Sequence, residues 1–360
     1  MTRTITLGID QLYRRQPGGI ATYVRGLVRG LEHVDGADLE VLGLAPRGPV
    51  PSLAVGLGIP LVSAPLSVEP LTRLWKYRAL GVPTRSNVVH ATSMAGPYGG
   101  GAAHAVHSVA LHDLLWRDAS SATIARGARF HEDRLRFLKR REDLRLFTSS
   151  PGLRELLISE GFDGARIFPV RLGVDDDAQT SATVEVVRDE LARHGVNGPF
   201  TLYVGTREPR KNLERLVEAH HQARAASPEL GPLVLVGPSG WGGVDTGDAT
   251  VLGTVDRELL KGLYRDATLF AYVPVAEGWG LPPVEALHAG TRVIASTTTP
   301  SVADNDEVVR VDPLDVASIA QGLVRALATD TDEASAIRRR ASVAGLTWVN
   351  SAHDHLAGWS

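Results

Sequence analysis

The sequence predicts an α/β protein built from two doubly wound domains. Short apolar runs alternate with helical segments along the chain, a pattern typical of mostly parallel sheets. The alternation comes in two series, separated by a polar, Gly/Pro-flanked segment at residues 173–199. With 360 residues, of which 43% are hydrophobic and 22% charged, the chain is long enough for two separate cores.

The first series predicts an N-terminal domain over residues 1–175. Four apolar runs are interpreted as strands, at residues 5–9, 39–44, 87–92 and 107–113. Residues 21–34, between the first two runs, have the 3.6-residue spacing of an amphipathic helix. A strand, a helix and a second strand in this order favour a parallel pair with a crossover helix.

The second series predicts a C-terminal domain over residues 198–345. Its expected strands lie at residues 200–206, 232–237, 249–253, 268–273 and 291–296. Its expected helices lie at residues 213–226, 257–266 and 283–289. Strands that alternate with helices of this length again indicate a doubly wound sheet.

The composition excludes several chemistries. There is no cysteine, so disulfides, thiolate metal sites, iron–sulfur clusters and cysteine nucleophiles are ruled out. The N-terminal ten residues lack a continuous apolar stretch, and the uncharged stretch at residues 48–66 contains four prolines. We therefore expect a cytoplasmic protein. Only four of the 38 basic residues are lysines: Lys76, Lys139, Lys211 and Lys261.

The net charge of −3 conceals an uneven distribution. Residues 1–180 carry a net charge of +4, whereas residues 181–360 carry −7. The segment Arg126–Arg145 holds eight basic and four acidic residues. It is interpreted as a solvated amphipathic helix or, alternatively, as a docking surface for an anionic membrane or an acidic acceptor. No aromatic platform accompanies the charge, which argues against nucleic acid.

Two glutamates eight residues apart mark the most informative segment, EGWGLPPVEALHAGTRVIAS at residues 277–296. Glu277 follows an expected strand, whereas Glu285 lies on an expected helix. The glycines between them allow a ligand to approach the backbone, and a helix N-terminus attracts anionic oxygens. Both carboxylates can accept hydrogen bonds from sugar hydroxyls on either side of a bound phosphate. The alternative is a coincidental pair around a structural turn.

A basic loop follows the first strand of the second series. Arg207, Arg210 and Lys211 cluster between Gly205, where that strand ends, and the next helix. Cations at such a loop can hold a pyrophosphate and offset charge on a leaving phosphate. A solvated basic loop is the alternative interpretation.

Two N-terminal features are weaker signals. Gly18 and Gly19 precede a helix and place backbone amides near the end of the first strand, although an ordinary turn has the same appearance. His112 and Asp113 follow an apolar strand, and open α/β sheets bind ligands at the carboxyl ends of their strands. A lone histidine is more often structural.

Together these segments resemble the retaining GT-B glycosyltransferases of the glycogen-synthase-like and mannosyltransferase-like group, family GT4. Residues 277–296 resemble its E-x7-E signature, GTREPRKNL its basic loop, and PLVLVGPSGWGG a segment of one subgroup. Weaker similarity covers the GGI…Y loop, NVVHATS, HDL and TSSPGLRELL. LTWVNSA resembles the last helix of the family, which implies that residues 346–360 pack back on the N-terminal domain.

The resemblance implies a donor site in the C-terminal domain. Glu277 would contact hydroxyls of the donor sugar, and Glu285 would bind the ribose of the nucleotide. The backbone of Gly278, Trp279, Gly280 and Leu281 would face the sugar and phosphates. Lys211 would hold the diphosphate together with Arg207 or Arg210. Thr206 stands where the family often has the arginine, so the identity of the second cation stays open.

The resemblance also implies an acceptor site in the N-terminal domain. His112 would lie near the transferred sugar, and Gly18, Gly19 and Tyr23 would border the diphosphate and the acceptor. The implied reaction moves a hexose, mannose first, from a GDP-, UDP- or dTDP-sugar to a hydroxyl of a glycan or glycolipid. It needs neither a tightly bound cofactor nor a metal. A non-catalytic nucleotide-sugar-binding subunit and a GT-B epimerase are the alternatives.

Overall fold

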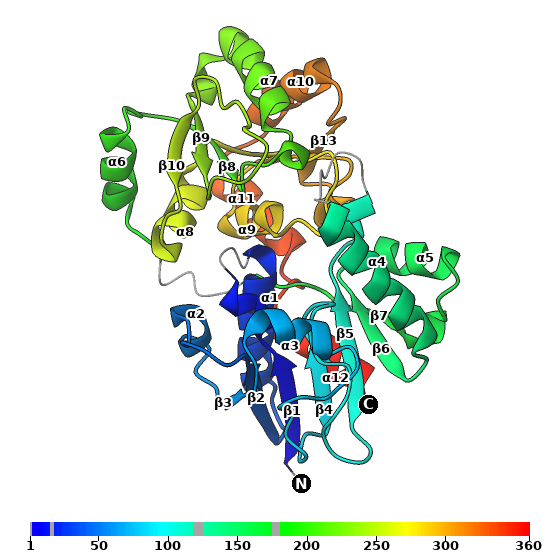
Figure 1. Ribbon diagram of the computed structural model, residues 1–360. Coiled ribbons are helices and arrows are strands. Elements are labelled where there is room, and N and C mark those ends of the chain that lie inside the picture. Colours follow the sequence, from blue (N-terminus) through cyan, green and yellow to red (C-terminus); the bar gives the residue numbers. More distant parts are fainter. Residues whose placement is uncertain (1, 15–17, 118–124, 175–180) are drawn as a thin grey trace. The chain divides into compact units, whose positions relative to one another are not determined.

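A computed structural model describes residues 2–14, 18–117, 125–174 and 181–360 (Figure 1). The described part of residues 1–173 forms an N-terminal unit together with residues 346–360. The described part of residues 174–345 forms a C-terminal unit. Each unit has its own parallel sheet, and no helix within the described ranges is both long and apolar enough to cross a bilayer.

The N-terminal unit is built on a seven-stranded sheet of order β3-β2-β1-β4-β5-β6-β7, in which all neighbouring strands are parallel. The order reverses between β1 and β4, which creates a switch point at their carboxyl ends. The strands are β1 (Arg3–Gly8), β2 (Leu39–Ala45), β3 (Leu61–Ser63), β4 (Val88–Ala91), β5 (Val106–Leu111), β6 (Leu144–Thr148) and β7 (Ile167–Pro169). The helices are α1 (Gly18–Glu32), α2 (Ser52–Val55), α3 (Val68–Leu74), α4 (Ala125–Arg140), α5 (Pro151–Ser159) and α12 (Trp348–Trp359).

The C-terminal helix α12 packs on α1 within the N-terminal unit. Two glycines of α1 make the close approach possible: a Cβ on Gly26 would lie 2.0 Å from the ring of Trp348, and one on Gly30 would lie 2.0 Å from its carbonyl oxygen. Thr347 caps the helix by accepting a hydrogen bond from the backbone N–H of Asn350. Trp359, at the other end of α12, is completely buried.

The C-terminal unit has a six-stranded parallel sheet of order β10-β9-β8-β11-β12-β13, with the reversal between β8 and β11. The strands are β8 (Thr201–Val204), β9 (Leu233–Val236), β10 (Thr250–Gly253), β11 (Leu269–Tyr272), β12 (Val293–Ser296) and β13 (Val308–Val311). The helices are α6 (Val184–Arg193), α7 (Leu213–Ala226), α8 (Arg257–Asp266), α9 (Leu281–Ala289), α10 (Val316–Leu327) and α11 (Glu333–Ser342). A short 3₁₀ helix, η6 (Pro209–Lys211), precedes α7.

The predicted α/β class with two doubly wound sheets is confirmed. Helices α7 and α8 have the predicted bounds, and α9 begins two residues earlier than predicted, at Leu281. The prediction for Arg126–Arg145 was wrong in extent, because α4 ends at Arg140 and Arg145 lies on β6.

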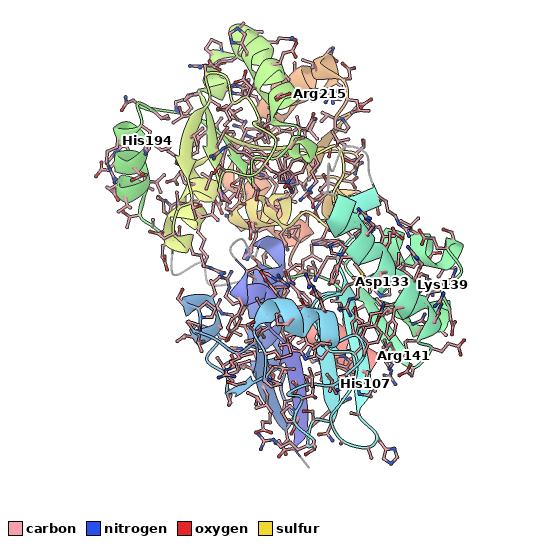
Figure 2. The ribbon with its side chains drawn as sticks, in the orientation of Figure 1. His107, Asp133, Lys139, Arg141, His194 and Arg215 are labelled. Carbon is pink, nitrogen blue, oxygen red and sulfur yellow. The ribbon has the colours of Figure 1, made fainter. Side chains whose placement is uncertain are left out.

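Arg134 lies on the buried side of this helix, where it is 1% exposed and donates to the carbonyl of Thr72. Figure 2 shows Asp133 and Lys139 on α4. Both are exposed, and Asp133 forms an ion pair with Lys76. The basic surface of α4 is therefore narrower than its composition indicates.

Candidate functional site

The candidate site lies in the C-terminal unit, at the carboxyl ends of the two strands where the sheet order reverses. The loop after β8 carries η6, and the loop after β11 leads into α9. Residues 211, 272 and 277 meet there, although 61 to 66 positions separate the first from the other two. Doubly wound sheets bind ligands at such a switch point.

Lys211, the last residue of η6, is 8% exposed and reaches the centre of this group. Its Nζ donates to Glu277 Oε2 and, over 2.5 Å, to the hydroxyl of Tyr272. The next residue, Asn212, holds the loop in place: its Nδ2 donates to the carbonyl of Val273 over 2.9 Å and to that of Pro313 over 2.6 Å. Asn212 has a φ of 62°, a left-handed conformation that asparagine tolerates better than most residues.

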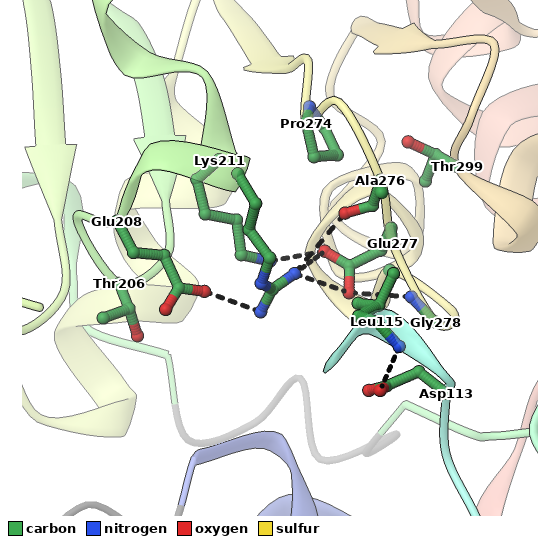
Figure 3. Close-up of polar contacts among 12 residues, drawn as sticks. Asp113, Leu115, Thr206, Glu208, Lys211, Pro274, Ala276, Glu277, Gly278 and Thr299 are labelled. Carbon is green, nitrogen blue, oxygen red and sulfur yellow. Dashed lines mark hydrogen bonds and ion pairs between the residues drawn. The ribbon is translucent and has the colours of Figure 1, made fainter. Parts of the chain in front are cut away.

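Arg210 is the second cation of the cluster, and its two carboxylate partners, Glu208 and Glu277, are labelled in Figure 3. Its Nη1 lies 3.4 Å from both carboxylate oxygens of Glu277, and its Nη2 lies 2.6 Å from Glu208 Oε1. Arg207 points elsewhere and donates from Nη1 to the carbonyl of Gly237 over 2.9 Å. Lys211 and Arg210 therefore share Glu277 as a partner, whereas Arg207 binds a backbone carbonyl.

The charge state of Glu277 follows from its neighbours. Burial by itself raises the pKa of this carboxyl group, but the positive charges of Lys211 and Arg210 outweigh burial and lower it to about 2. Burial lowers the pKa of Lys211, and the adjacent carboxylate opposes that effect. Glu277 is therefore ionised at neutral pH and is not available as a proton donor. Both of its oxygens accept from protein donors, including the backbone N–H of Gly278 over 3.1 Å.

The loop between Glu277 and α9 turns at Gly280. That residue has a φ of 94°, and a Cβ on it would lie 2.6 Å from Thr299 Cγ2, so glycine is required for both reasons. The hydroxyl of Ser301 donates to the Gly280 carbonyl over 2.6 Å, and its backbone N–H donates to the carbonyl of Trp279 over 3.0 Å. These contacts fix the entry into α9, whose first residue is Leu281.

Glu285 lies on α9, as predicted, and accepts a hydrogen bond from the hydroxyl of Tyr264 over 2.8 Å. Gly205 follows β8, and its N–H donates to the carbonyl of Val236. Two functional candidates, Tyr264 and Tyr272, escaped the sequence analysis. Tyr272 ends an apolar strand and Tyr264 lies on a helix, so in the sequence both look like core residues. Only the hydroxyl group distinguishes each from an ordinary core side chain.

In the N-terminal unit, His112 follows β5, and its Nε2 donates to the carbonyl of Thr92 over 2.9 Å. Burial lowers the pKa of His112. The ring of Tyr23 meets His112 edge-on, with centroids 4.9 Å apart. Gly18 and Gly19 form the first turn of α1, and open space surrounds the Cβ position of each.

The structure places Tyr23 in the core of the N-terminal unit. It is 1% exposed, and its hydroxyl lies 2.8 Å from His90 Nε2 and 2.7 Å from His355 Nε2. Those two contacts occupy the hydroxyl. Of the three residues predicted for the acceptor and phosphate loop, only the two glycines therefore lie where a ligand has space.

The two units thus define the class of protein: a pair of doubly wound α/β units, one with a cation–carboxylate cluster at its switch point. Comparison with known proteins identifies the class further. Residues 198–329 match the family described as glycosyl transferases group 1. The O-antigen chain mannosyltransferase B of Escherichia coli is 34% identical over 164 residues, which are 42% of this chain and 43% of that protein.

A D-inositol 3-phosphate glycosyltransferase of Mycobacteroides abscessus is 30% identical over 230 residues, 60% of this chain and 48% of that protein. The chain thus spans less than half the length of both relatives.

Among solved structures, Anabaena HepE in complex with UDP and glucose aligns with a TM-score of 0.72 and 16% identity, over 99% of this chain and 98% of that one. Sucrose-phosphate synthase from Thermosynechococcus elongatus aligns over the same shares with a TM-score of 0.71 and 22% identity. The predicted resemblance to GT-B glycosyltransferases of group 1 is confirmed.

Proposed function

We propose that this protein is a retaining glycosyltransferase that moves a hexose from a nucleoside-diphosphate sugar to a hydroxyl of a glycan or glycolipid acceptor. The C-terminal unit holds the donor, and the N-terminal unit holds the acceptor. The observation that carries the proposal is the pairing of Lys211 and Arg210 around ionised Glu277 beside the start of α9.

The chemical problem in glycosyl transfer is the negative charge that develops on the departing diphosphate. Two preorganised cations and the amides at a helix start stabilise that charge. In this scheme the acceptor hydroxyl attacks from the face that the diphosphate leaves, and a phosphate oxygen takes its proton. Glu277 orients the two cations, which agrees with a carboxylate that stays ionised far below neutral pH. The proposed reaction draws on these side chains rather than on a metal held by the protein.

A mannose-type donor on GDP is the first candidate. It is supported by the similarity to the O-antigen mannosyltransferase of E. coli. The likeness to a UDP-bound HepE makes UDP the second nucleotide to test, with dTDP and ADP after it. Thermal-shift measurements with the four nucleoside diphosphates would identify the base, because a ligand of the folded state raises the melting temperature by mass action.

The acceptor site is proposed at the carboxyl ends of β1, β4 and β5, around His112 and the first turn of α1. Gly18 and Gly19 have open space there, and His112 lies directly after β5. The exposed cations Arg136 and Arg140 of α4 are a proposed contact with the inner membrane face if the acceptor is a glycolipid. Stronger sedimentation with anionic vesicles than with neutral ones would support that contact, and equal sedimentation would argue against it.

The experiment that tests the function is incubation of the purified protein with the donor, with and without acceptor, in the presence of a chelator. Transfer or slow donor hydrolysis supports a glycosyltransferase. Binding without turnover supports a non-catalytic partner subunit. Interconversion of the free nucleotide sugar without acceptor supports an epimerase.

A further inference from the structure

Each glutamate of the pair in the C-terminal unit accepts a hydrogen bond from a buried tyrosine. Tyr272 donates to Glu277 Oε2 over 2.5 Å, and Tyr264 donates to Glu285 Oε2 over 2.8 Å. Tyr272 is the last residue of β11, and Tyr264 lies on α8. Two different elements therefore reach the two carboxylates.

Tyr272 joins the two charges at the centre of the candidate site. Its hydroxyl accepts from Lys211 Nζ over 2.5 Å while it donates to Glu277, so one oxygen touches both partners of the ion pair. Tyr272 is 1% exposed, and the ring of Tyr203 stacks on it at 6.2 Å between centroids. A shift of this hydroxyl would therefore move both the lysine and the carboxylate.

Tyr264 contacts only the second carboxylate of the pair. Its ring is 2% exposed and meets Phe270 at 60°, with centroids 5.3 Å apart. Its backbone carbonyl accepts from the hydroxyl of Thr291. The Thr291 hydrogen bond thus holds the backbone of Tyr264, and Phe270 holds its ring. Glu285 is therefore oriented by a rigid partner.

Both hydroxyls keep their protons. Burial raises the pKa of Tyr272, and the charge of Glu277 raises it further. Burial raises the pKa of Tyr264 in the same way, with Glu285 as the second cause. Each tyrosine is therefore a permanent donor, and the direction of each hydrogen bond is fixed.

We propose that Tyr272 and Tyr264 are positioning residues with separate tasks at the nucleotide site. Tyr272 aligns Lys211 and Glu277 and so governs recognition of the diphosphate. Tyr264 aligns Glu285 and so governs recognition of the ribose. This inference rests on the proposed function, because it takes the ligand to be a nucleoside diphosphate.

The test compares three variants of the full chain that each lose one buried hydroxyl: Tyr272→Phe, Tyr264→Phe and the control Tyr203→Phe. The Tyr203 hydroxyl donates to the Thr206 carbonyl over 3.4 Å, and within the described part of the chain it forms no hydrogen bond with Glu277 or Glu285. The ligands are whichever of UDP, GDP, dTDP and ADP stabilises the wild-type protein most, and the matching nucleoside monophosphate. Calorimetry gives the dissociation constant of each pair.

Tyr272→Phe should weaken binding of the diphosphate about 10-fold and that of the monophosphate by a clearly smaller factor, since one hydrogen bond to charged groups is lost. Tyr264→Phe should weaken both ligands by the same factor of about 5 to 10, because both carry the ribose. The control should leave both affinities within about twofold of the wild type, given its weak hydroxyl contact.

A double-mutant cycle supplies an independent reading. In a Glu285→Ala background, Tyr264→Phe should have no further effect on affinity, because its partner is gone. A full effect in that background would overturn the role given to Tyr264. Equal losses for both ligands in both tyrosine variants, or losses no larger than in the control, would overturn the division of tasks while the proposed function stands. If no nucleotide binds the wild-type protein, the proposed function fails and the inference fails with it.

Discussion

Each unit of this protein contains a buried polar cluster with a tyrosine hydroxyl at its centre, but the two clusters differ in charge. In the N-terminal unit, Tyr23 lies between His90 and His355, and all the groups are neutral. In the C-terminal unit, Tyr272 lies between the charged side chains of Lys211 and Glu277. The neutral cluster fastens a helix, whereas the ionic one presents cations at a switch point.

The neutral cluster forms a complete chain of hydrogen bonds. His355 Nδ1 donates to the Ser351 carbonyl, so its Nε2 accepts from the Tyr23 hydroxyl. The Tyr23 oxygen then accepts from His90 Nε2, and His90 Nδ1 accepts from the hydroxyl of Ser108. Ser108 in turn accepts from the indole N–H of Trp359 over 2.8 Å.

This series of hydrogen bonds ties β4, β5 and α1 to the middle of α12 at His355 and to its C-terminal end at Trp359, and it has no place for an additional proton. Burial, and then the neighbouring histidines, lower the pKa of His90. Burial lowers the pKa of His355 to about 4. A buried polar cluster is stable when all of its groups are hydrogen-bonded, whether those groups are neutral or charged. In this protein the neutral cluster holds a helix in place, and the ion pair lies where we propose that a charged ligand binds.

The largest expected effect is on the ionic cluster. Lys211→Ala should lower the rate of sugar transfer about 100- to 1,000-fold, the usual cost of removing a preorganised group that stabilises a leaving charge. The matched control is Lys139→Ala on α4 of the N-terminal unit, which should change the rate less than about twofold, as exposed substitutions do. Unchanged transfer by Lys211→Ala would remove the basis of the functional assignment.

Acid should weaken the neutral cluster first. The folded-state pKa of His355 is about 4, below the ordinary 6.5, so its contribution is complete above pH 6.5 and is lost as the pH falls toward 4. The loss is about 3 kcal/mol for this group. Glu277, lowered from 4.5 to about 2, keeps its full contribution down to pH 4.5. The free energy of unfolding of the wild type, measured with urea, should therefore decrease as the pH falls from 6.5 to 4.5.

The control for this prediction is His355→Gln, which should be less stable than the wild type at pH 7.5 but should show a shallower dependence on pH. Identical slopes for the two proteins would contradict the neutral assignment.

The two arginines of the basic loop should separate by function. Arg210→Ala removes a cation beside Glu277 and should lower transfer about 10- to 50-fold, as expected for a charge-assisted contact. Arg207→Ala should lower transfer by less than about threefold, because its guanidinium binds a backbone carbonyl. Steady-state kinetics of both variants test this prediction. Equal losses of transfer rate would show that Arg207 also belongs to the functional cluster.

The smallest expected effect is that of Tyr23→Phe. Loss of this hydroxyl leaves two buried histidine nitrogens without their partner and should lower the free energy of unfolding by about 1–3 kcal/mol. Nucleotide affinity of the C-terminal unit should stay unchanged, in contrast to the effect of Tyr272→Phe. Calorimetric binding and urea unfolding measured on the same variant test this, and an altered affinity would show that the two clusters are coupled.

The sequence predicted the central strands and the helices α7 and α8 well, because their apolar runs and caps are local signals. It missed β6, β7 and β13, which lie toward the sheet edges. At the site, spacing identified Lys211, Glu277 and Glu285 as candidates. It could not choose between Arg207 and Arg210, since loop geometry decides where each guanidinium points.

Tyr272 and Tyr264 were missed because a buried aromatic residue at a strand end or on a helix looks like part of the core until the partner of its hydroxyl is known. Tyr23 lies on the expected helix at residues 21–34, and its burial inside the N-terminal unit could not be predicted from the resemblance alone.

The most direct test of the central claim uses the scarcity of lysine. With only four lysines in the chain, selective ¹³C-lysine labelling gives four side-chain NMR signals, and Lys211→Arg assigns one of them. Addition of the preferred nucleoside diphosphate should shift the Lys211 signal most strongly, in step with saturation of the site. Saturable binding of the nucleotide with an unmoved Lys211 signal would contradict the claim that this cluster holds the diphosphate.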